Sequence, residues 1–262
     1  MENYLFYFKT SKTNNIKKLF EVLKEIVQTD YILIISPDGI RMNKEDLLTM
    51  NVVSMKLEAS DFEEYYCNEK VFVMLNSKPV YIVTKTVLNT DIISFYITKD
   101  DPWKLQICNT DKTGETESIS KITRLDCENQ KEMRIADITG YNTTKILSSK
   151  FNKICKDFNN LLSDHIIITD NDTNITFSCI TDEYIQNVVI RQEPDTLNKK
   201  LMNKVSGKYR LKSIIPFIKG VNLTDNDNNV IKLHITNTKL LVIQYNIGCL
   251  GNIRLITREY TK

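Results

Sequence analysis

The stretch SKFNKICKDF, residues 149–158, sets the pattern from which the fold follows. A helical rotation of about 100° per residue places its apolar side chains on one arc and its lysines on the opposite arc. The apolar arc holds Phe151, Ile154, Cys155 and Phe158. The basic arc holds Lys150, Lys153 and Lys156. An ordinary solvated surface helix has the same pattern, so its meaning depends on whether the design recurs.

Three further segments repeat this design, each with an apolar face at helical spacing and two lysines seven residues apart. They are NNIKKLFEVLKEIVQT at 14–29, SKPVYIVTKTV at 77–87 and LKSIIPFIKG at 211–220. The lysine pairs are Lys17 and Lys24, Lys78 and Lys85, and Lys212 and Lys219. We therefore predict four helices, which start near residues 15, 78, 150 and 212.

Local signals predict where two of these helices begin and end. Ser77 or Lys78 is expected to cap the second helix, with Pro79 in its first turn, where the missing N–H costs nothing. Pro216 predicts that the fourth helix is short, because proline is tolerated only near a helix start. We expect Ser213 to cap that helix and Gly220 to end it.

Each predicted helix is followed by runs rich in Ile, Val, Phe and Tyr. Clusters of Asp, Asn, Gly or Pro break these runs, which predicts a strand, a turn and a second strand. The first and third helices start about 135 residues apart, as do the second and fourth, so two similar halves are expected. The expected fold class is α+β, with mostly antiparallel sheets that carry all four helices on one face.

A charged segment without a clear period lies between the two halves. It is TRLDCENQKEM, residues 123–133, and it is typical of a linker. The expected division is a first domain at 1–123, a connecting linker at 124–133 and a second domain at 134–262.

Composition excludes several classes of protein. Of the 262 residues, 42% are hydrophobic, which suffices for a sizeable core. Six cysteines are scattered singly, which argues against a zinc site or a secreted disulfide scaffold. No signal peptide is evident, and no run nears the roughly 20 apolar residues that a membrane span needs. A soluble protein of a reducing compartment, without membrane contact, is expected.

The net charge is only +2, so any affinity for nucleic acid must come from where the charges lie. Four equivalent helices with lysines at matching spacing predict one continuous basic surface. Such a surface, without a glycine-rich phosphate loop, suits sequence-independent contact with a duplex backbone. A merely solvated face is the alternative. A single-strand binder should also show exposed aromatic residues there, and the helices offer only Tyr81.

No catalytic constellation is evident in the sequence. The only histidines, His165 and His234, fall in strand-like stretches and are expected to be structural. The acidic clusters at 61–64 and 99–101 fall at turns and strand ends, where a solvated surface explains them. No hydrolase motif or phosphate-binding loop is present, so we expect no enzymatic activity, no cofactor and no metal.

Several strings, in order along the whole chain, resemble the proliferating cell nuclear antigen (PCNA) family of sliding clamps. They are IKKLFEVLKEI (16–26), SPDGIRMNKEDLLTMNVVSMKL (36–57), FNKICKDF (151–158) and LLVIQYNIGCLGNIRLITRE (240–259). No single string is diagnostic, but the co-linear set is. The composition, rich in Asn, Ile and Lys, is typical of an AT-rich genome, such as that of a large DNA virus or a protist.

The resemblance implies a homotrimeric ring of six similar domains, with helices around a hole for double-stranded DNA and sheets outside. Such a clamp does no chemistry, but tethers DNA polymerase at high effective concentration. An ATP-dependent clamp loader opens the ring, so the clamp needs no nucleotide site. The implied location is the nucleus or a cytoplasmic viral replication compartment. A monomeric processivity factor that holds DNA on a basic face remains an alternative.

The resemblance also assigns residues to three sites. The basic inner-face positions are matched by Lys17, Lys18, Lys24, Lys85, Lys153, Lys156, Lys212 and Lys219, and helical geometry adds Lys78 and Lys150. The pocket for partner peptides is matched by Met50, Val52, Leu125 and Ile256. The subunit interface, at two expected edge strands, is matched by Ile119, Ile122, Tyr184, Ile185 and Val188.

The pocket also departs from the family's pattern. Glu45 stands where the family has a methionine, and Ile256 replaces a tyrosine. Thr257, Arg258 and Glu259 replace the usual ending of apolar residues and proline. Together with a shorter linker, these changes predict a partner peptide that deviates from the family's usual motif.

Overall fold

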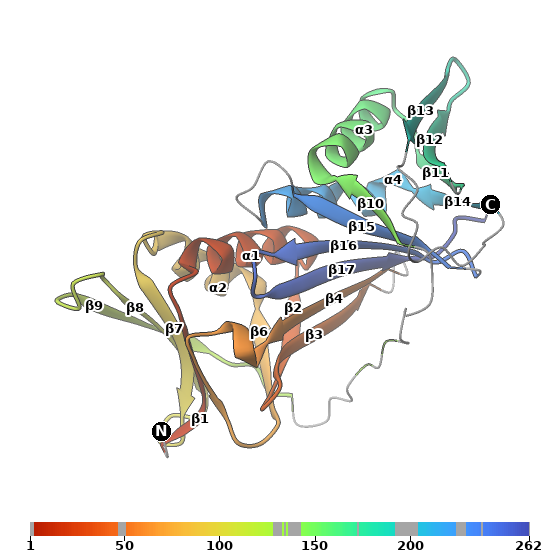
Figure 1. Ribbon diagram of the computed structural model, residues 1–262. Coiled ribbons are helices and arrows are strands. Elements are labelled where there is room, and N and C mark those ends of the chain that lie inside the picture. Colours follow the sequence, from red (N-terminus) through yellow and green to blue (C-terminus); the bar gives the residue numbers. More distant parts are fainter. Residues whose placement is uncertain are drawn as a thin grey trace. The chain divides into compact units, whose positions relative to one another are not determined.

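The computed structural model describes residues 3–46, 51–127, 133, 135, 143–171, 173–191, 204–223, 229–236 and 238–261. Across these residues, one order of elements occurs four times: a strand, a helix and three strands (Figure 1). This order confirms the α+β class and the four predicted helices. Three strands follow each helix, whereas the sequence pattern predicted a pair.

The first repeat consists of β1 (Tyr4–Thr10), α1 (Thr13–Ile26), β2 (Asp30–Ser36), β3 (Gly39–Asp46) and β4 (Asn51–Glu58). A short 3₁₀ helix, η1 (Ala59–Asp61), and β5 (Glu64–Cys67) come next. The second repeat consists of β6 (Val71–Asn76), α2 (Ser77–Thr86), β7 (Ile92–Thr98), β8 (Lys104–Thr110) and β9 (Glu117–Thr123).

The third repeat consists of β10 (Thr144–Leu147), α3 (Ser148–Asn160), β11 (His165–Asp170), β12 (Asn174–Ile180) and β13 (Ile185–Arg191). The fourth consists of β14 (Val205–Arg210), α4 (Leu211–Ile214) with the 3₁₀ helix η2 (Ile215–Leu223), β15 (Val230–Ile235), β16 (Leu241–Ile247) and β17 (Gly251–Thr257).

The chain forms two compact units. Unit 1 comprises Met1–Lys44, Ser54–Arg134 and Asn246–Ile253, and unit 2 comprises Glu45–Val53, Ile135–Tyr245 and Arg254–Lys262. Unit 1 contains a sheet of order β5-β1-β7-β8-β9, and unit 2 contains a sheet of order β13-β12-β11-β14. Neighbouring strands in both of these sheets run antiparallel.

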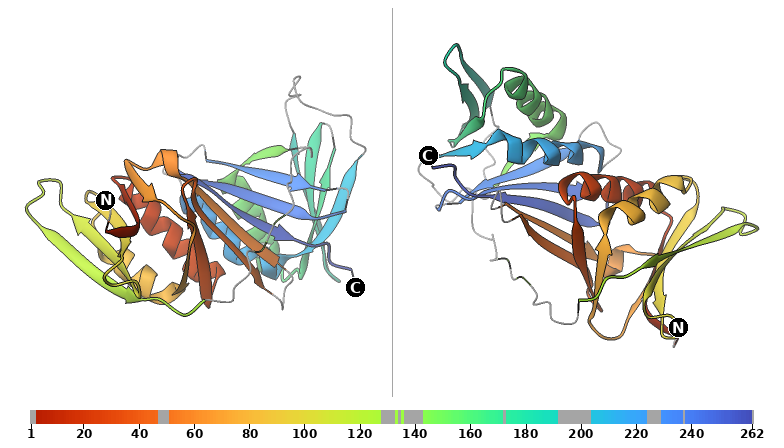
Figure 2. Two further views of the ribbon diagram at one scale, coloured as in Figure 1. Left: turned by 90° about the horizontal axis from the view of Figure 1, so that it is seen from below. Right: turned by 180° about the vertical axis from the view of Figure 1, so that it is seen from behind.

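Aromatic stacking fixes α1 on the sheet of unit 1. The ring of Phe20 on α1 stacks on Phe95 of β7, with centroids 5.6 Å apart. Phe95 in turn stacks on Phe8 of β1 at 4.8 Å. Helices α1 and α2 pack beside each other in this unit (Figure 2). Their apolar sides are therefore buried, and their polar sides face away from the sheet.

Helix α3 has the same relation to the sheet of unit 2. Its apolar arc of Phe151, Ile154, Cys155 and Phe158 is buried. The Phe151 ring lies 5.9 Å from that of Phe177 on β12. All three lysines of the opposite arc are exposed, so the amphipathic pattern predicted from 149–158 is confirmed.

Two predicted helix starts are wrong. The cap of α2 is Asn76, one residue before the expected Ser77, because the Asn76 side chain accepts a hydrogen bond from the Lys78 backbone N–H at 3.0 Å. In the fourth helix, Ser213 is not a cap, since α4 starts at Leu211.

The fourth helix also continues past Pro216. It does so as η2, a 3₁₀ helix that runs to Leu223, so Gly220 is not its stop. Gly220 instead packs against a fully buried aromatic ring. A Cβ atom at this position would lie 2.7 Å from Cδ2 of Tyr245.

Gly220→Ala should therefore lower the free energy of unfolding by about 1–3 kcal/mol, the usual cost of overpacking a core. The Tyr245 ring is fully buried and packs edge-on against Phe217, with ring centroids 5.2 Å apart, so moving it aside would also shift its neighbours. Urea titration followed by circular dichroism measures the change, with Lys219→Ala as the neighbouring surface control. Equal stability of Gly220→Ala and the unmodified protein would contradict the close packing.

Candidate nucleic-acid interface

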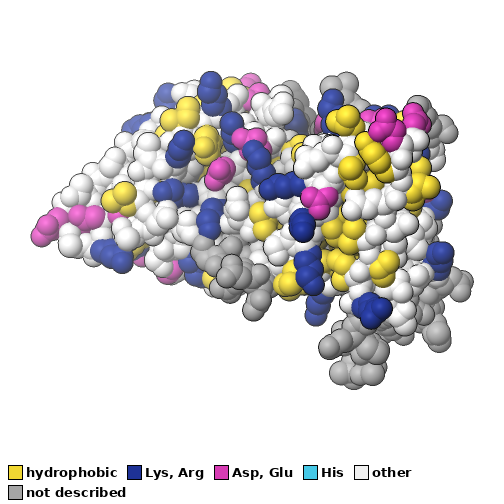
Figure 3. Space-filling view, turned by 90° about the horizontal axis from the view of Figure 1, so that it is seen from above, with side chains coloured by type: hydrophobic (Ala, Val, Ile, Leu, Met, Phe, Trp, Pro, Cys, Tyr) yellow, Lys and Arg dark blue, Asp and Glu magenta, His cyan; other side chains and the backbone are white. Residues whose placement is uncertain are grey.

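The four helical segments concentrate the positive charge of the chain. They carry ten lysines against Glu21, Glu25 and Asp157, a net charge of +7, whereas the whole chain carries +2. The remainder of the chain therefore carries a net charge of −5. On the side shown in Figure 3, basic side chains recur, with acidic and apolar side chains among them.

The predicted lysines of unit 2 are all exposed. Lys150, Lys153 and Lys156 lie on the outer side of α3, and Lys212 and Lys219 lie on α4 and η2. Five cations therefore project from the helical segments of this unit toward solvent, where a phosphate backbone could reach them.

Three of the five predicted lysines of unit 1, those on α1, are less exposed. Lys78 and Lys85 on α2 are exposed, whereas Lys17, Lys18 and Lys24 on α1 are half-buried. The Lys17 ammonium donates a hydrogen bond to the carbonyl of Val87, just after α2. The Lys24 ammonium pairs with Glu25 at 3.0 Å, and this hydrogen bond raises the pKa of Lys24.

Two edge strands contain the residues assigned to a subunit interface. Strand β9 ends the sheet of unit 1, and β13 ends the sheet of unit 2. Ile119 on β9 is 49% exposed and Ile185 on β13 is 70% exposed, while Tyr184 just before β13 is also exposed. Val188 is half-buried, and Ile122 is buried beneath the sheet rather than exposed.

The sequence assignment missed one residue of this edge. Val189 on β13 is 56% exposed, whereas the predicted interface residue Val188 is half-buried. Alternation along the strand is the signal that could have found it. Val188 faces Phe177 on the core side, so Val189 points to the opposite side.

The residues assigned to a partner-peptide pocket fall in separate parts of the chain. Val52 and Ile256 belong to unit 2, and Leu125 belongs to unit 1, while Met50 lies outside the described residues. Leu125 is 37% exposed, and its backbone N–H donates to the carbonyl of Met74 at 2.9 Å. Ile256 is largely buried, so it supports the local core as well.

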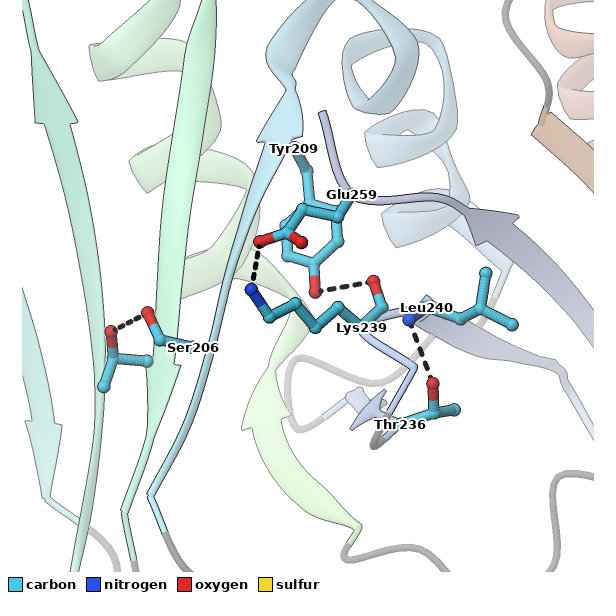
Figure 4. Close-up of polar contacts among 7 residues, drawn as sticks. Ser206, Tyr209, Thr236, Lys239, Leu240 and Glu259 are labelled. Carbon is cyan, nitrogen blue, oxygen red and sulfur yellow. Dashed lines mark hydrogen bonds and ion pairs between the residues drawn. The ribbon is translucent and has the colours of Figure 1, made fainter. Parts of the chain in front are cut away.

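Contacts within unit 2 hold the C-terminal residues. Figure 4 shows Lys239 bonded to both Tyr209 and Glu259: its carbonyl accepts from the Tyr209 hydroxyl at 3.2 Å, and its ammonium pairs with Glu259 at 3.0 Å. The backbone N–H of the next residue, Tyr260, donates to the backbone carbonyl of Lys208 at 2.7 Å. Its ring centroid lies 4.6 Å from the Arg210 guanidinium. Glu259, expected at a charged rim, is thus an ion-pair partner.

Both histidines lie in strands, as expected. His234 on β15 is half-buried, with Nδ1 3.2 Å from the Thr143 hydroxyl. Burial, with Arg254 and Lys232 nearby, lowers its pKa to about 4. Within the described part of the chain, no cluster of His, Cys, Asp or Glu could hold a metal ion. No described helix is long and apolar enough to cross a membrane.

Repeated strand–helix–strand units, with antiparallel sheets beneath lysine-bearing helices, define a clamp fold. Comparison with known sequences agrees. Residues 5–133 match the N-terminal domain of proliferating cell nuclear antigen, and residues 134–259 match its C-terminal domain. The chain therefore belongs to the PCNA family.

Two relatives cover most of the chain. A "Probable DNA polymerase sliding clamp 1" from Paramecium bursaria Chlorella virus 1 is 26% identical over 264 residues, which cover 97% of each chain. A "Proliferating cell nuclear antigen" from Chaetomium thermophilum is 25% identical over 241 residues, which cover 89% of each chain. The family resemblance found in the sequence is thus confirmed.

Proposed function

We propose that this protein is a DNA sliding clamp, a processivity factor that encircles duplex DNA as a homotrimeric ring and tethers DNA polymerase. The observation that carries the proposal is the division of charge, +7 on the helical segments against −5 elsewhere. Lysine suits sliding contact, because a flexible point charge follows phosphates without fixing a register.

The proposed domains are a first clamp domain at 1–123, a linker at 124–133 and a second clamp domain at 134–262. The clamp acts without catalysis, because holding polymerase on DNA turns each rebinding into an intramolecular event. An ATP-dependent loader is the proposed partner for opening the ring. The relatives suggest a nuclear or viral replication compartment as the place of action.

Reversing two charges on α3 tests the DNA-facing role. Lys153→Glu with Lys156→Glu should reduce retention on circular duplex DNA and flatten the salt dependence of binding, because phosphate contacts release counterions. The apolar arc of α3 is untouched, so the fold should survive. Retention during gel filtration at several salt concentrations measures the effect.

The matched control is Lys112→Glu with Lys145→Glu, which makes the same change of charge at exposed positions outside the helices. This control should retain DNA like the unmodified protein. Equal loss in both double variants would mean that only net charge matters. If the α3 variant retains DNA as well as the unmodified protein, Lys153 and Lys156 serve only to solvate that face of the helix.

The two edge strands favour a ring over a monomeric factor. Exposed edges with apolar side chains invite pairing with another chain, and head-to-tail pairing can close a ring. Both β9 and β13 have seven residues. At full antiparallel overlap, Ile119 of one copy lies opposite Val189 of the next, and Glu117 lies opposite Arg191.

A charge swap tests this pairing. Glu117→Arg alone, or Arg191→Glu alone, places like charges opposite each other and should shift the trimer toward monomer. The combined variant restores opposite charges and should recover the trimer. Light scattering at micromolar and submicromolar concentrations measures the mass. Glu115→Arg, in the turn before β9, is the control.

A monomer mass for the unmodified protein at micromolar concentration would overturn the ring and favour the monomeric processivity factor. If the combined variant stays as dissociated as the single variants, the register is wrong even if the ring is right.

The proposed partner site includes Met50, Val52, Leu125 and Ile256, and it takes a short peptide with apolar anchors from the polymerase. The partial exposure of Leu125 supports it as a contact residue. The replacement of an aromatic residue by Ile256 removes a ring that would pack on aromatic anchors. A peptide that deviates from the family's usual motif is therefore proposed.

Leu125→Ala should weaken binding of a peptide from the cognate DNA polymerase by about 1–3 kcal/mol, the range for an interface hot spot. Calorimetry measures the affinity, and Leu162→Ala, at a side chain 87% exposed in unit 2, is the control. An unchanged affinity in Leu125→Ala would place the partner site elsewhere.

A further inference from the structure

Tyr81 lies at the point where two lysines from different helices converge. The Lys24 ammonium, on α1, is 5.5 Å from the centroid of the Tyr81 ring. The Lys85 ammonium, on α2, is 5.7 Å from the same centroid. Lys24 and Lys85 are 61 residues apart in sequence, so only the packing of α1 beside α2 brings them to one ring.

The surroundings of Tyr81 distinguish it from a core residue. It is half-buried, and its neighbour Ile82 is 51% exposed. Along α2, Lys78 and Lys85 stand three residues before and four residues after Tyr81, which places both on its side of the helix. The ring is thus part of the lysine-bearing surface of unit 1.

We propose that Tyr81 is a positioning residue that holds Lys24 and Lys85 as one phosphate-binding pair. This inference rests on the proposed DNA-facing role of the helices. A free lysine side chain loses much rotamer freedom when it binds a phosphate. Attraction between the ring and both ammonium groups restricts them beforehand, and each ammonium can still donate hydrogen bonds to phosphate oxygens.

The same contacts keep Lys24 available despite its acidic neighbour. Lys24 pairs with Glu25 at 3.0 Å, and a lysine held only by this carboxylate would be partly neutralised. The Tyr81 ring gives the Lys24 ammonium a second contact, with the ring centroid 5.5 Å away, beside the carboxylate of Glu25. In the proposal, this second contact keeps Lys24 on the lysine-bearing side despite its acidic neighbour.

Three variants of Tyr81 and a double-mutant cycle test the proposal. Tyr81→Phe keeps the ring and should bind duplex DNA like the unmodified protein. Tyr81→Leu keeps bulk without a π-face and should weaken binding about two- to five-fold, the range for one exposed cation–π contact. Tyr81→Ala should weaken it at least as much. Fluorescence anisotropy with a labelled duplex measures affinity.

The cycle separates positioning from a general structural role. In a background of Lys24→Gln with Lys85→Gln, Tyr81→Leu should have no further effect on affinity, because the groups that it positions are gone. In a background of Lys153→Gln with Lys156→Gln, on the other unit, Tyr81→Leu should keep its full effect.

Three results would overturn the proposal: full affinity in Tyr81→Leu, an equal loss in Tyr81→Phe, or a persistent loss in the Lys24→Gln, Lys85→Gln background. Failure of the proposed function looks different. In that case the unmodified protein itself shows no salt-dependent affinity for duplex DNA, whatever residue stands at position 81.

Discussion

Each unit is organised by one contact, in which the apolar face of a helix packs onto an antiparallel sheet. In unit 1, Phe20 stacks on Phe95, and in unit 2, Phe151 lies against Phe177. Since a helix that buries one arc must present the other to solvent, this packing also decides where the lysines lie. Core stability and surface charge are therefore two results of one pattern. The acidic residues, which mostly lie outside the helical segments, leave the remainder of the chain negative.

The ends of the sheets are the second consequence of this architecture. A sheet of finite width leaves an edge strand with free backbone groups, and native proteins usually shorten, charge or cover such edges. Strands β9 and β13 are seven residues long and carry exposed Ile119, Ile185 and Val189. These are features of edges suited to pairing with another copy. The opposite charges at Glu117 and Arg191 would favour one direction and one register of that pairing.

The lysines of the two units differ in a way that their spacing does not show. Those of unit 2 project into solvent, whereas on α1 Lys17 bonds to the Val87 carbonyl and Lys24 meets Glu25 and Tyr81. Helix α1 thus offers cations with restricted positions, and the lysines of unit 2 are more exposed. For a protein that must hold DNA and still move along it, exposed flexible side chains can follow the backbone, and restricted charges lose less entropy on contact.

The four helices, their apolar and basic faces, the α+β class and the family could all be predicted from the sequence. These features depend on local periodicity and on strings along the chain, so a single sequence reveals them. It did not determine which of several local cap and helix geometries the chain adopts, or which distant segments meet. Asn76 caps α2 because its side chain reaches the Lys78 N–H, and the fourth helix passes Pro216 as a 3₁₀ helix. Gly220 is needed because Tyr245, 25 residues later in the chain, fills the space beside it. The Gly220–Tyr245 contact and the convergence of Lys24 and Lys85 on Tyr81 could be found only in the folded chain, because each requires two segments that meet through packing rather than through sequence spacing.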